Sequence, residues 1–278
     1  MGQARGLAHA SHPGPTLAVT ILLACLAALS GRSEWGVALV AGTVLTGQLA
    51  IGWCNDLIDR DRDAAVGRTD KPLATGAVSP GVVRTATAVA LVSCVPLSLA
   101  NGWVAGSAHL AAVAWGLAYD AGLKATVWSA VPYAASFGLQ IAFVSYGGPG
   151  GGPPSASVVI ATMLLAVGAH LTNAAPDLDD DAATGVRGLP HRLGARASLG
   201  GAAAAFVLSV GLIALDDPAG ASPGSLALVG SAFVLASFVA VSALRLDGTR
   251  QPSRWVFRCA IAVGAIGVAL LVVRGGVR

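Results

Sequence analysis

The sequence predicts an all-α polytopic membrane protein with nine transmembrane helices around a central cavity. Of its 278 residues, 55% are hydrophobic and only 11% are charged, and the mean hydropathy is +0.72. A soluble domain averages about 25% charged residues, so the composition excludes an ordinary soluble protein. Nine apolar segments are each a candidate for a helix across the roughly 30 Å hydrocarbon core. No basic tract indicates nucleic-acid binding, and the four cysteines, which have no CxxC spacing, are expected to be small core residues.

The nine segments follow one another with mostly short connections. In chain order they are Thr16–Ser30, Trp35–Cys54, Val82–Ala100, Gly102–Ala118, Val127–Tyr146, Ala156–Ala175, Ala197–Leu215, Ser225–Leu244 and Val256–Val273. The first is short enough to be the apolar core of a signal peptide, but only Arg5 supplies the N-terminal positive charge that such peptides need. The connections after the second and the sixth segments are long and charged, and functional residues favour such loops.

The basic residues predict the orientation in the membrane. With nine spans, all but three of the 17 Lys and Arg residues lie on the face that carries the N-terminus. The three exceptions are Arg32, Arg274 and Arg278. Because cytoplasmic loops carry an excess of Lys and Arg, we expect the N-terminus and both long charged loops to be cytoplasmic.

A polar run from Asn55 to Asp63 interrupts the apolar sequence. If it is helical, Asn55, Asp59 and Asp63 recur at every fourth residue and Asp56 lies on the same face, while Asp61 points away. Like charges on one exposed helical face cost roughly 0.2–0.5 kcal/mol per pair, and more where water is scarce. The row therefore predicts a bound counter-charge. Mg²⁺ is the expected ion, because it binds one or two carboxylates together with substrate phosphates.

A second acidic run, Asp177 to Asp181, repeats the first. A shift of 118 residues aligns nine identical residues within 22 positions. In the two rows the aligned pairs are Asn55 with Asn173, Asp59 with Asp177 and Asp63 with Asp181. The offset spans four predicted helices, so the single domain 1–278 would contain two parallel halves, roughly 16–126 and 127–250, and a ninth helix. The two rows would then face each other across the cavity.

The residues around the two runs favour a diphosphate ligand over calcium. An EF-hand loop needs Gly at position 6 and Glu at position 12, but the first run has Ala64 and Asp70 there. Cations follow both runs, and others lie between them: Arg68 and Lys71, then Lys124 beside Tyr119, then Arg187, His191 and Arg192. Carboxylates that hold Mg²⁺ next to cations that hold oxyanions suit a diphosphate.

Three segments resemble the signatures of the UbiA superfamily of intramembrane prenyltransferases. They are Asn55-Asp56-x-x-Asp59-x-x-x-Asp63 with Arg68-Thr69-x-Lys71-Pro72-Leu73-x-x-Gly76, then Tyr119-x-x-x-x-Lys124, then Asp177-x-x-x-Asp181-x-x-x-Gly185. The first is most similar to the 4-hydroxybenzoate polyprenyltransferase branch, and less to the menaquinone branch, which usually lacks the adjacent Asn-Asp pair. One position departs from the family: Lys71 stands where an arginine is usual, and lysine lacks bidentate phosphate geometry.

The resemblance implies Mg²⁺-dependent transfer of a prenyl group from a prenyl diphosphate to an acceptor, with an aromatic ring as the expected acceptor. The implied Mg²⁺ ligands are Asp56, Asp59, Asp63, Asp177 and Asp181. The implied diphosphate-binding residues are Asn55, Arg68, Lys71, Tyr119, Lys124, Asn173 and Arg187. Asp59, Asp177 and Lys124 would be catalytic. The cations in this set are also compatible with a second role, as positive-inside anchors.

Several alternatives stay open. Within the same family, an oxygen or a lipid phosphate could be the acceptor, or the prenyl chain could cyclise without one. A transporter is the alternative from another class, because parallel repeats are typical of carriers. Acidic rows at cytoplasmic helix ends and an outer half almost free of polar residues argue against a path through the membrane. His170 shares a helical face with Asn173 and Asp177, where it either orients or deprotonates the acceptor or forms a hydrogen bond to another helix. Pro176 is expected to break the sixth helix.

Overall fold

The computed structural model describes residues 2–216, 222–246 and 255–273, and this part of the chain contains helices, turns and loops but no strand. The all-α prediction is therefore confirmed for it. The long helices are α2 (Pro13–Leu29), α3 (Glu34–Ala65), α4 (Pro80–Leu99), α5 (Trp103–Asp120), α6 (Ala130–Gly147), α7 (Ala156–Ala174), α9 (Leu189–Leu215), α10 (Pro223–Leu244) and α11 (Trp255–Val273). The short ones are α1 (Gln3–Ala10), η1 (Leu123–Ala125), η2 (Ala175–Asp177) and α8 (Leu178–Ala183).

Each of the nine apolar segments corresponds to one long helix. By length and composition, five stretches within the described ranges can cross a membrane: α3, α4, α7 with its continuation to Ala183, α9 and α10. The pair α1 and α2, bent by 62°, would make a sixth. The chain is thus an integral membrane protein, and the count of nine spans stays a prediction. The orientation prediction also uses Arg250, Arg254, Arg274 and Arg278, which lie outside the described residues.

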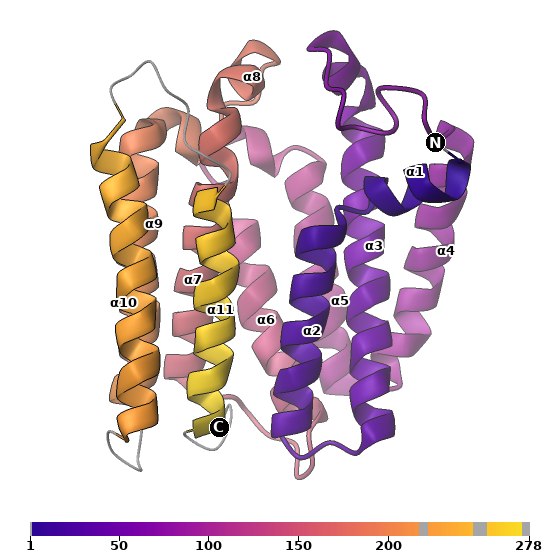
Figure 1. Cartoon of the computed structure of the whole chain (residues 1–278). Coiled ribbons are helices and arrows are strands. Elements are labelled where there is room, and N and C mark those ends of the chain that lie inside the picture. The colour runs from indigo at the N-terminus through magenta and orange to yellow at the C-terminus, as the bar shows by residue number, and fades with distance from the viewer. Residues whose placement is uncertain (1, 217–221, 247–254, 274–278) are drawn as a thin grey trace.

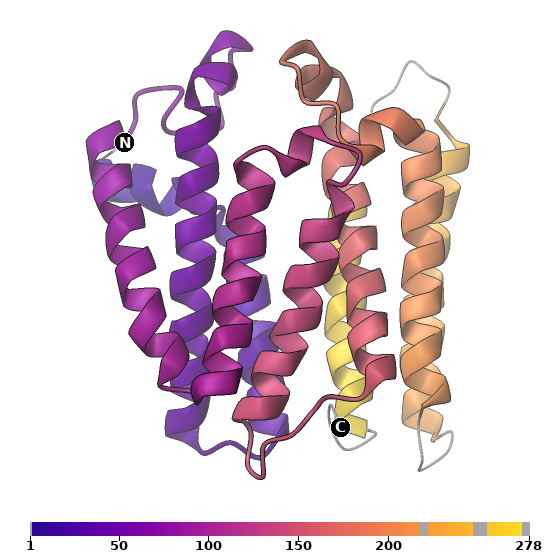
Figure 2. The same cartoon turned by 180° about the vertical axis from the view of Figure 1, so that it is seen from behind.

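The long helices form a bundle in which most chain neighbours pack against each other (Figures 1 and 2). Helix α11 packs back onto α7, α9 and α2, so the last helix also contacts the first long one. The largest hydrophobic core cluster draws its buried side chains from nearly all of these helices, among them Leu26, Phe143, Leu199 and Phe206. This arrangement leaves α2, α3, α5, α6, α7 and α11 around one cavity.

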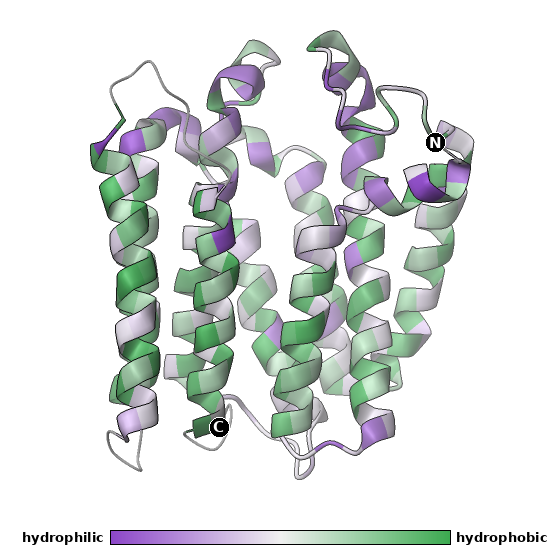
Figure 3. Cartoon of the chain, in the orientation of Figure 1, coloured by the Kyte–Doolittle hydropathy of each residue, from purple (hydrophilic) through white to green (hydrophobic). Residues whose placement is uncertain are grey.

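Both acidic runs lie at the same end of the bundle. Figure 3 shows hydrophilic residues gathered at the end that carries α8, α1 and the last turns of α3, while the helix bodies are largely hydrophobic. Helix α3 has 32 residues, so it carries the first row beyond its apolar part. On the other side, Pro176 lies in the 3₁₀ turn η2 that separates α7 from α8, which confirms the predicted helix break.

The segments that follow the two rows have matching backbones. Gly67 and Gly185, which the 118-residue shift aligns, have φ values of +71° and +86°, a region that glycine adopts without steric cost. Five residues beyond Asp63 and Asp181, a backbone amide donates to the carbonyl oxygen of that aspartate, at 2.9 Å in both segments. The remainder of the proposed internal repeat stays a prediction.

The half of the bundle away from the acidic rows, which the sequence predicts to be the outer half, is more polar than expected. His109 is fully buried there and lies 2.8 Å from the hydroxyl of Ser98. Asn101 donates to Thr43 and accepts from Arg32 at 2.6 Å. The expectation of an outer half almost free of polar residues was therefore wrong. Sequence alone could not separate these residues from lipid-facing ones, because their partners come from other helices.

Candidate active site

A cavity of about 470 Å³ opens at the polar end of the bundle. Its lining includes all the predicted site residues except one: Asn55, Asp56, Asp59, Asp63, Arg68, Lys71, Tyr119, Lys124, Asn173, Asp177 and Asp181. The exception, Arg187, is exposed and is not among the lining residues. A second hollow of about 570 Å³, between α1, α3 and α4, is lined by no charged side chain and so lacks groups for a diphosphate.

The first row lies on the helical face that the spacing predicted. Asp56, Asp59 and Asp63 are only 1%, 5% and 7% exposed, whereas the side chain of Asp61 is 87% exposed. Because unpaired buried carboxylates are costly, each buried member of the row needs a cation. The structure supplies protein cations for them.

Asp59 is held by two cations. Lys124, on the 3₁₀ turn η1, donates to both carboxylate oxygens of Asp59 at 2.6 Å. Arg62, one helical turn beyond Asp59, lies 2.7 Å from its Oδ2. Lys124 is itself 8% exposed, so this is a buried ion pair. A lysine from the α5–α6 connection is thereby brought directly onto the first acidic row.

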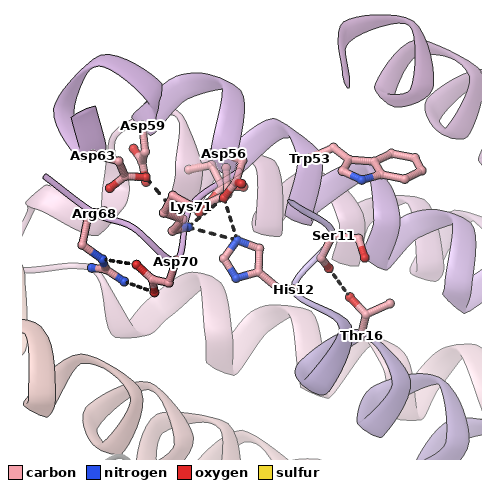
Figure 4. Close-up of polar contacts among 12 residues, drawn as sticks. Ser11, His12, Thr16, Trp53, Asp56, Asp59, Asp63, Arg68, Asp70 and Lys71 are labelled. Atoms are coloured by element: carbon pink, nitrogen blue, oxygen red, sulfur yellow. Dashed lines mark hydrogen bonds and ion pairs between the residues drawn. The ribbon is translucent and has the colours of Figure 1, made fainter. Parts of the chain in front are cut away.

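Asp56 is bound by a lysine and a histidine (Figure 4). Its Oδ1 lies 2.7 Å from Nζ of Lys71 and 3.0 Å from Nε2 of His12. Arg68 instead turns to Asp70 and donates two hydrogen bonds, at 2.8 and 2.9 Å. These bonds raise the pKa of Arg68 above its usual range, so it stays charged at the cavity mouth.

The second row is less enclosed. Asp177 and Asp181 are both half-buried, and Nε2 of His191 lies 3.6 Å from Oδ2 of Asp181. Asn173 lines the cavity one turn before Asp177. The carboxylates of this row therefore line the cavity and are more exposed than those of the first row.

Three rings form one wall of the cavity. Tyr119 meets Tyr133 and His170 edge-on, with centroids 5.1 and 5.7 Å away, and the centroids of Tyr133 and His170 are 4.8 Å apart. Nε2 of His170 lies 3.0 Å from the hydroxyl of Ser129. His170 thus bonds across to the start of α6, as one of its two predicted roles required, and it also lines the cavity.

Asp120 is a carboxylate that the sequence analysis missed. It follows Tyr119 directly, is 3% exposed, and accepts a hydrogen bond of 2.9 Å from the side-chain amide of Asn55. Because a carboxylate only accepts, this bond uses the NH₂ group of Asn55 and leaves its carbonyl oxygen available. Its place beside the Tyr119–Lys124 motif was the only signal in the sequence.

The lining is rich in charge. It contains seven carboxylates (Asp56, Asp59, Asp63, Asp70, Asp120, Asp177 and Asp181) and four permanent cations (Arg62, Arg68, Lys71 and Lys124). If every carboxyl group is ionised, the lining carries a charge of −3 with neutral histidines. No three His, Cys, Asp or Glu side chains of the described ranges converge into a protein-only metal site. This donor set suits Mg²⁺, which takes one or two carboxylates and completes its shell with substrate oxygens and water.

Comparison with known proteins identifies the family. Residues 17–272 match the UbiA prenyltransferase family. The chain belongs to this family. It is 31% identical over 220 residues to the digeranylgeranylglyceryl phosphate synthase of Natronomonas pharaonis, and this alignment covers 76% of each chain. The resemblance found in the three motifs is therefore confirmed, and the protein is a prenyltransferase.

Solved structures show the same fold. A UbiA homologue from Archaeoglobus fulgidus, bound to GPP and Mg²⁺, superposes with a TM-score of 0.75 at 17% identity, over 95% of this chain and 97% of that one. An apo UbiA homologue from Aeropyrum pernix K1 superposes with a TM-score of 0.72 at 19% identity, over 98% of each chain. The helical bundle with its cavity is thus a UbiA-type fold.

Proposed function

We propose that this protein is an Mg²⁺-dependent prenyltransferase that moves a prenyl group from a prenyl diphosphate to an acceptor and releases diphosphate. The observation that carries the proposal is the composition of the cavity. Its lining has an excess of carboxylates, although the substrate would itself be an anion. A diphosphate can enter such a site only together with cations, and a homologous structure contains GPP and Mg²⁺.

Each part of the cavity has a role in this reaction. Mg²⁺ ions, bound through Asp59, Asp63, Asp177 and Asp181, would neutralise the charge that grows on the departing diphosphate. Lys124 would add a fixed positive charge at the same place. The wall of Tyr119, Tyr133 and His170 presents aromatic faces, which stabilise a neighbouring cation. Breaking the C–O bond to diphosphate would form an allylic cation there; the acceptor would attack it and then lose a proton.

The rest of the cavity suits a hydrocarbon chain. Away from the acidic rows, its lining becomes apolar and includes Leu22, Phe137, Leu165, Phe257 and Ile261. Apolar walls hold a prenyl tail and also keep water from the cation, which would otherwise be hydrolysed. The same lining would exclude a freely hydrated carrier substrate, which favours transfer over transport.

The acceptor has two candidates. The form of the first motif predicts an aromatic ring. The similarity to a digeranylgeranylglyceryl phosphate synthase supports a hydroxyl group on a glyceryl phosphate lipid instead. Incubating the purified protein and Mg²⁺ with geranylgeranyl diphosphate and either 4-hydroxybenzoate or geranylgeranylglyceryl phosphate, with products read by mass, separates these two. Incubation without an acceptor tests cyclisation.

The central test uses the two acidic rows. We expect Asp59→Asn and Asp177→Asn each to abolish Mg²⁺-dependent release of diphosphate from a prenyl diphosphate. Asp61→Asn serves as the matched control, because Asp61 belongs to the same run but points outward. Unchanged turnover in both site variants would contradict the proposed mechanism.

The topology proposal completes this picture. We place all nine long helices across the membrane, with the site and the N-terminus in the cytoplasm, because the basic residues gather on that face. Cysteine labelling from outside intact cells tests it. Ser33→Cys should react with a membrane-impermeant reagent and Thr69→Cys should not, with the opposite pattern contradicting the orientation.

A further inference from the structure

His12 is brought to the site by the N-terminal elbow between α1 and α2. It has φ = +52° and is the only described non-glycine residue with a positive φ. L residues other than Gly rarely adopt this conformation, and those that do cluster at functional sites. Its imidazole lies between α2 and the first acidic row, where Figure 4 shows it pointing toward Asp56 and Lys71.

The elbow is packed tightly, so this position of His12 is built into the fold. A Cβ on Gly52 would lie 2.7 Å from the carbonyl oxygen of Ser11, which shows how closely the elbow approaches α3. That carbonyl accepts a hydrogen bond of 2.7 Å from Thr16. Leu7, one helical turn before Ser11, is also held against α3, because its carbonyl oxygen accepts a hydrogen bond of 2.9 Å from the indole of Trp53. Contacts on both sides of His12 therefore determine its conformation.

His12 and Lys71 form a compact pair of nitrogen donors. Nε2 of His12 and Nζ of Lys71 are 3.2 Å apart and both contact Oδ1 of Asp56, so Nδ1 of His12 and the remaining Nζ hydrogens of Lys71 are the donors left for a ligand. An ammonium group binds phosphate as a single point charge, whereas two fixed donors side by side can contact two oxygens of one phosphoryl group. Asp56, which is 1% exposed, anchors both side chains.

We propose that His12 and Lys71 together form a two-pronged binding element for the diphosphate group, with Asp56 as its holder. His12 is then a substrate-binding residue, and Asp56 acts mainly on these two side chains in place of the Mg²⁺-ligand role that the family resemblance implies. This inference rests on the proposed prenyl-diphosphate function. It predicts that one arginine, with its bidentate fork, can replace the pair.

The test measures binding of geranyl S-thiolodiphosphate, a slowly ionising analogue, to the full-length protein in nanodiscs with Mg²⁺. His12→Gly is the informative variant, because glycine accepts the left-handed backbone and removes only the imidazole. We expect its Kd to rise roughly tenfold, the effect of one lost charge-assisted hydrogen bond. Adding Lys71→Arg to this variant should restore Kd to within about threefold of wild type. Arg5→Ala, on the exposed surface of α1 and not among the residues that line the cavity, is the control and should leave Kd unchanged.

The outcomes separate the two proposals. Binding and Mg²⁺-dependent diphosphate release by the wild-type protein support the proposed function whatever His12 does, and failure of both contradicts it. If the wild type binds and His12→Gly, with unchanged thermal stability, binds equally well, the pair does not exist as proposed. The pair is also overturned if Lys71→Arg fails to rescue the affinity of His12→Gly.

Discussion

Asp59 and Lys124 form a buried ion pair in the site. Lys124 Nζ lies 2.6 Å from both oxygens of Asp59, and the two side chains are 9% and 7% exposed. We expect Lys124→Met, in the absence of divalent cations, to lower the free energy of unfolding by about 3 kcal/mol. This value is the lower end of the usual cost of leaving a buried charge without its partner. We expect the lower end because Arg62, which lies 2.7 Å from Asp59, is still present in the variant.

A double-mutant cycle isolates this interaction. Lys124→Met, Asp59→Asn and the double variant are unfolded in mixed micelles with rising detergent denaturant, without Mg²⁺. The double variant should be more stable than the sum of the single changes predicts, by about 2 kcal/mol, because the neutral amide no longer needs the lysine. Additivity within about 0.5 kcal/mol, or a loss below about 1 kcal/mol for Lys124→Met alone, would refute the reasoning.

Three further changes follow from single contacts. Asp120→Ala should remove the acceptor of the hydrogen bond from the Asn55 amide and raise the Mg²⁺ concentration needed for half-maximal diphosphate release. Asp120→Asn can still accept that hydrogen bond and should stay close to wild type. Gly168→Ala would place a Cβ in collision with the ring of Phe206, so we expect a loss of about 1–3 kcal/mol in the free energy of unfolding in detergent; unchanged stability would contradict the packing. Asn101→Leu should cost about 2 kcal/mol by leaving a half-buried guanidinium without its acceptor, with KM for prenyl diphosphate unchanged because the site is at the other end.

The acidic site shows which inferences local spacing supports. A helical period of 3.6 residues requires Asn55, Asp59 and Asp63 to share a face and Asp61 to leave it, and the exposures agree. The helix break at Pro176 follows equally from a local rule, because proline removes an amide donor. Spacing also placed the second row on the same end of the bundle as the first.

The sequence by itself determined the membrane class, the all-α fold and the family, because each depends on composition, on helical period or on a contiguous motif. Of the twelve site residues that it predicts, eleven line the cavity, and their roles stay predictions. Only the tertiary structure decided the cation partners. Lys124 reaches Asp59 across 65 positions and His12 reaches Asp56 across 44, through packing between helices that no local pattern encodes. Arg187 illustrates the converse, because its place just after the second run is fixed by the sequence while its exposure depends on how the loop after α8 packs.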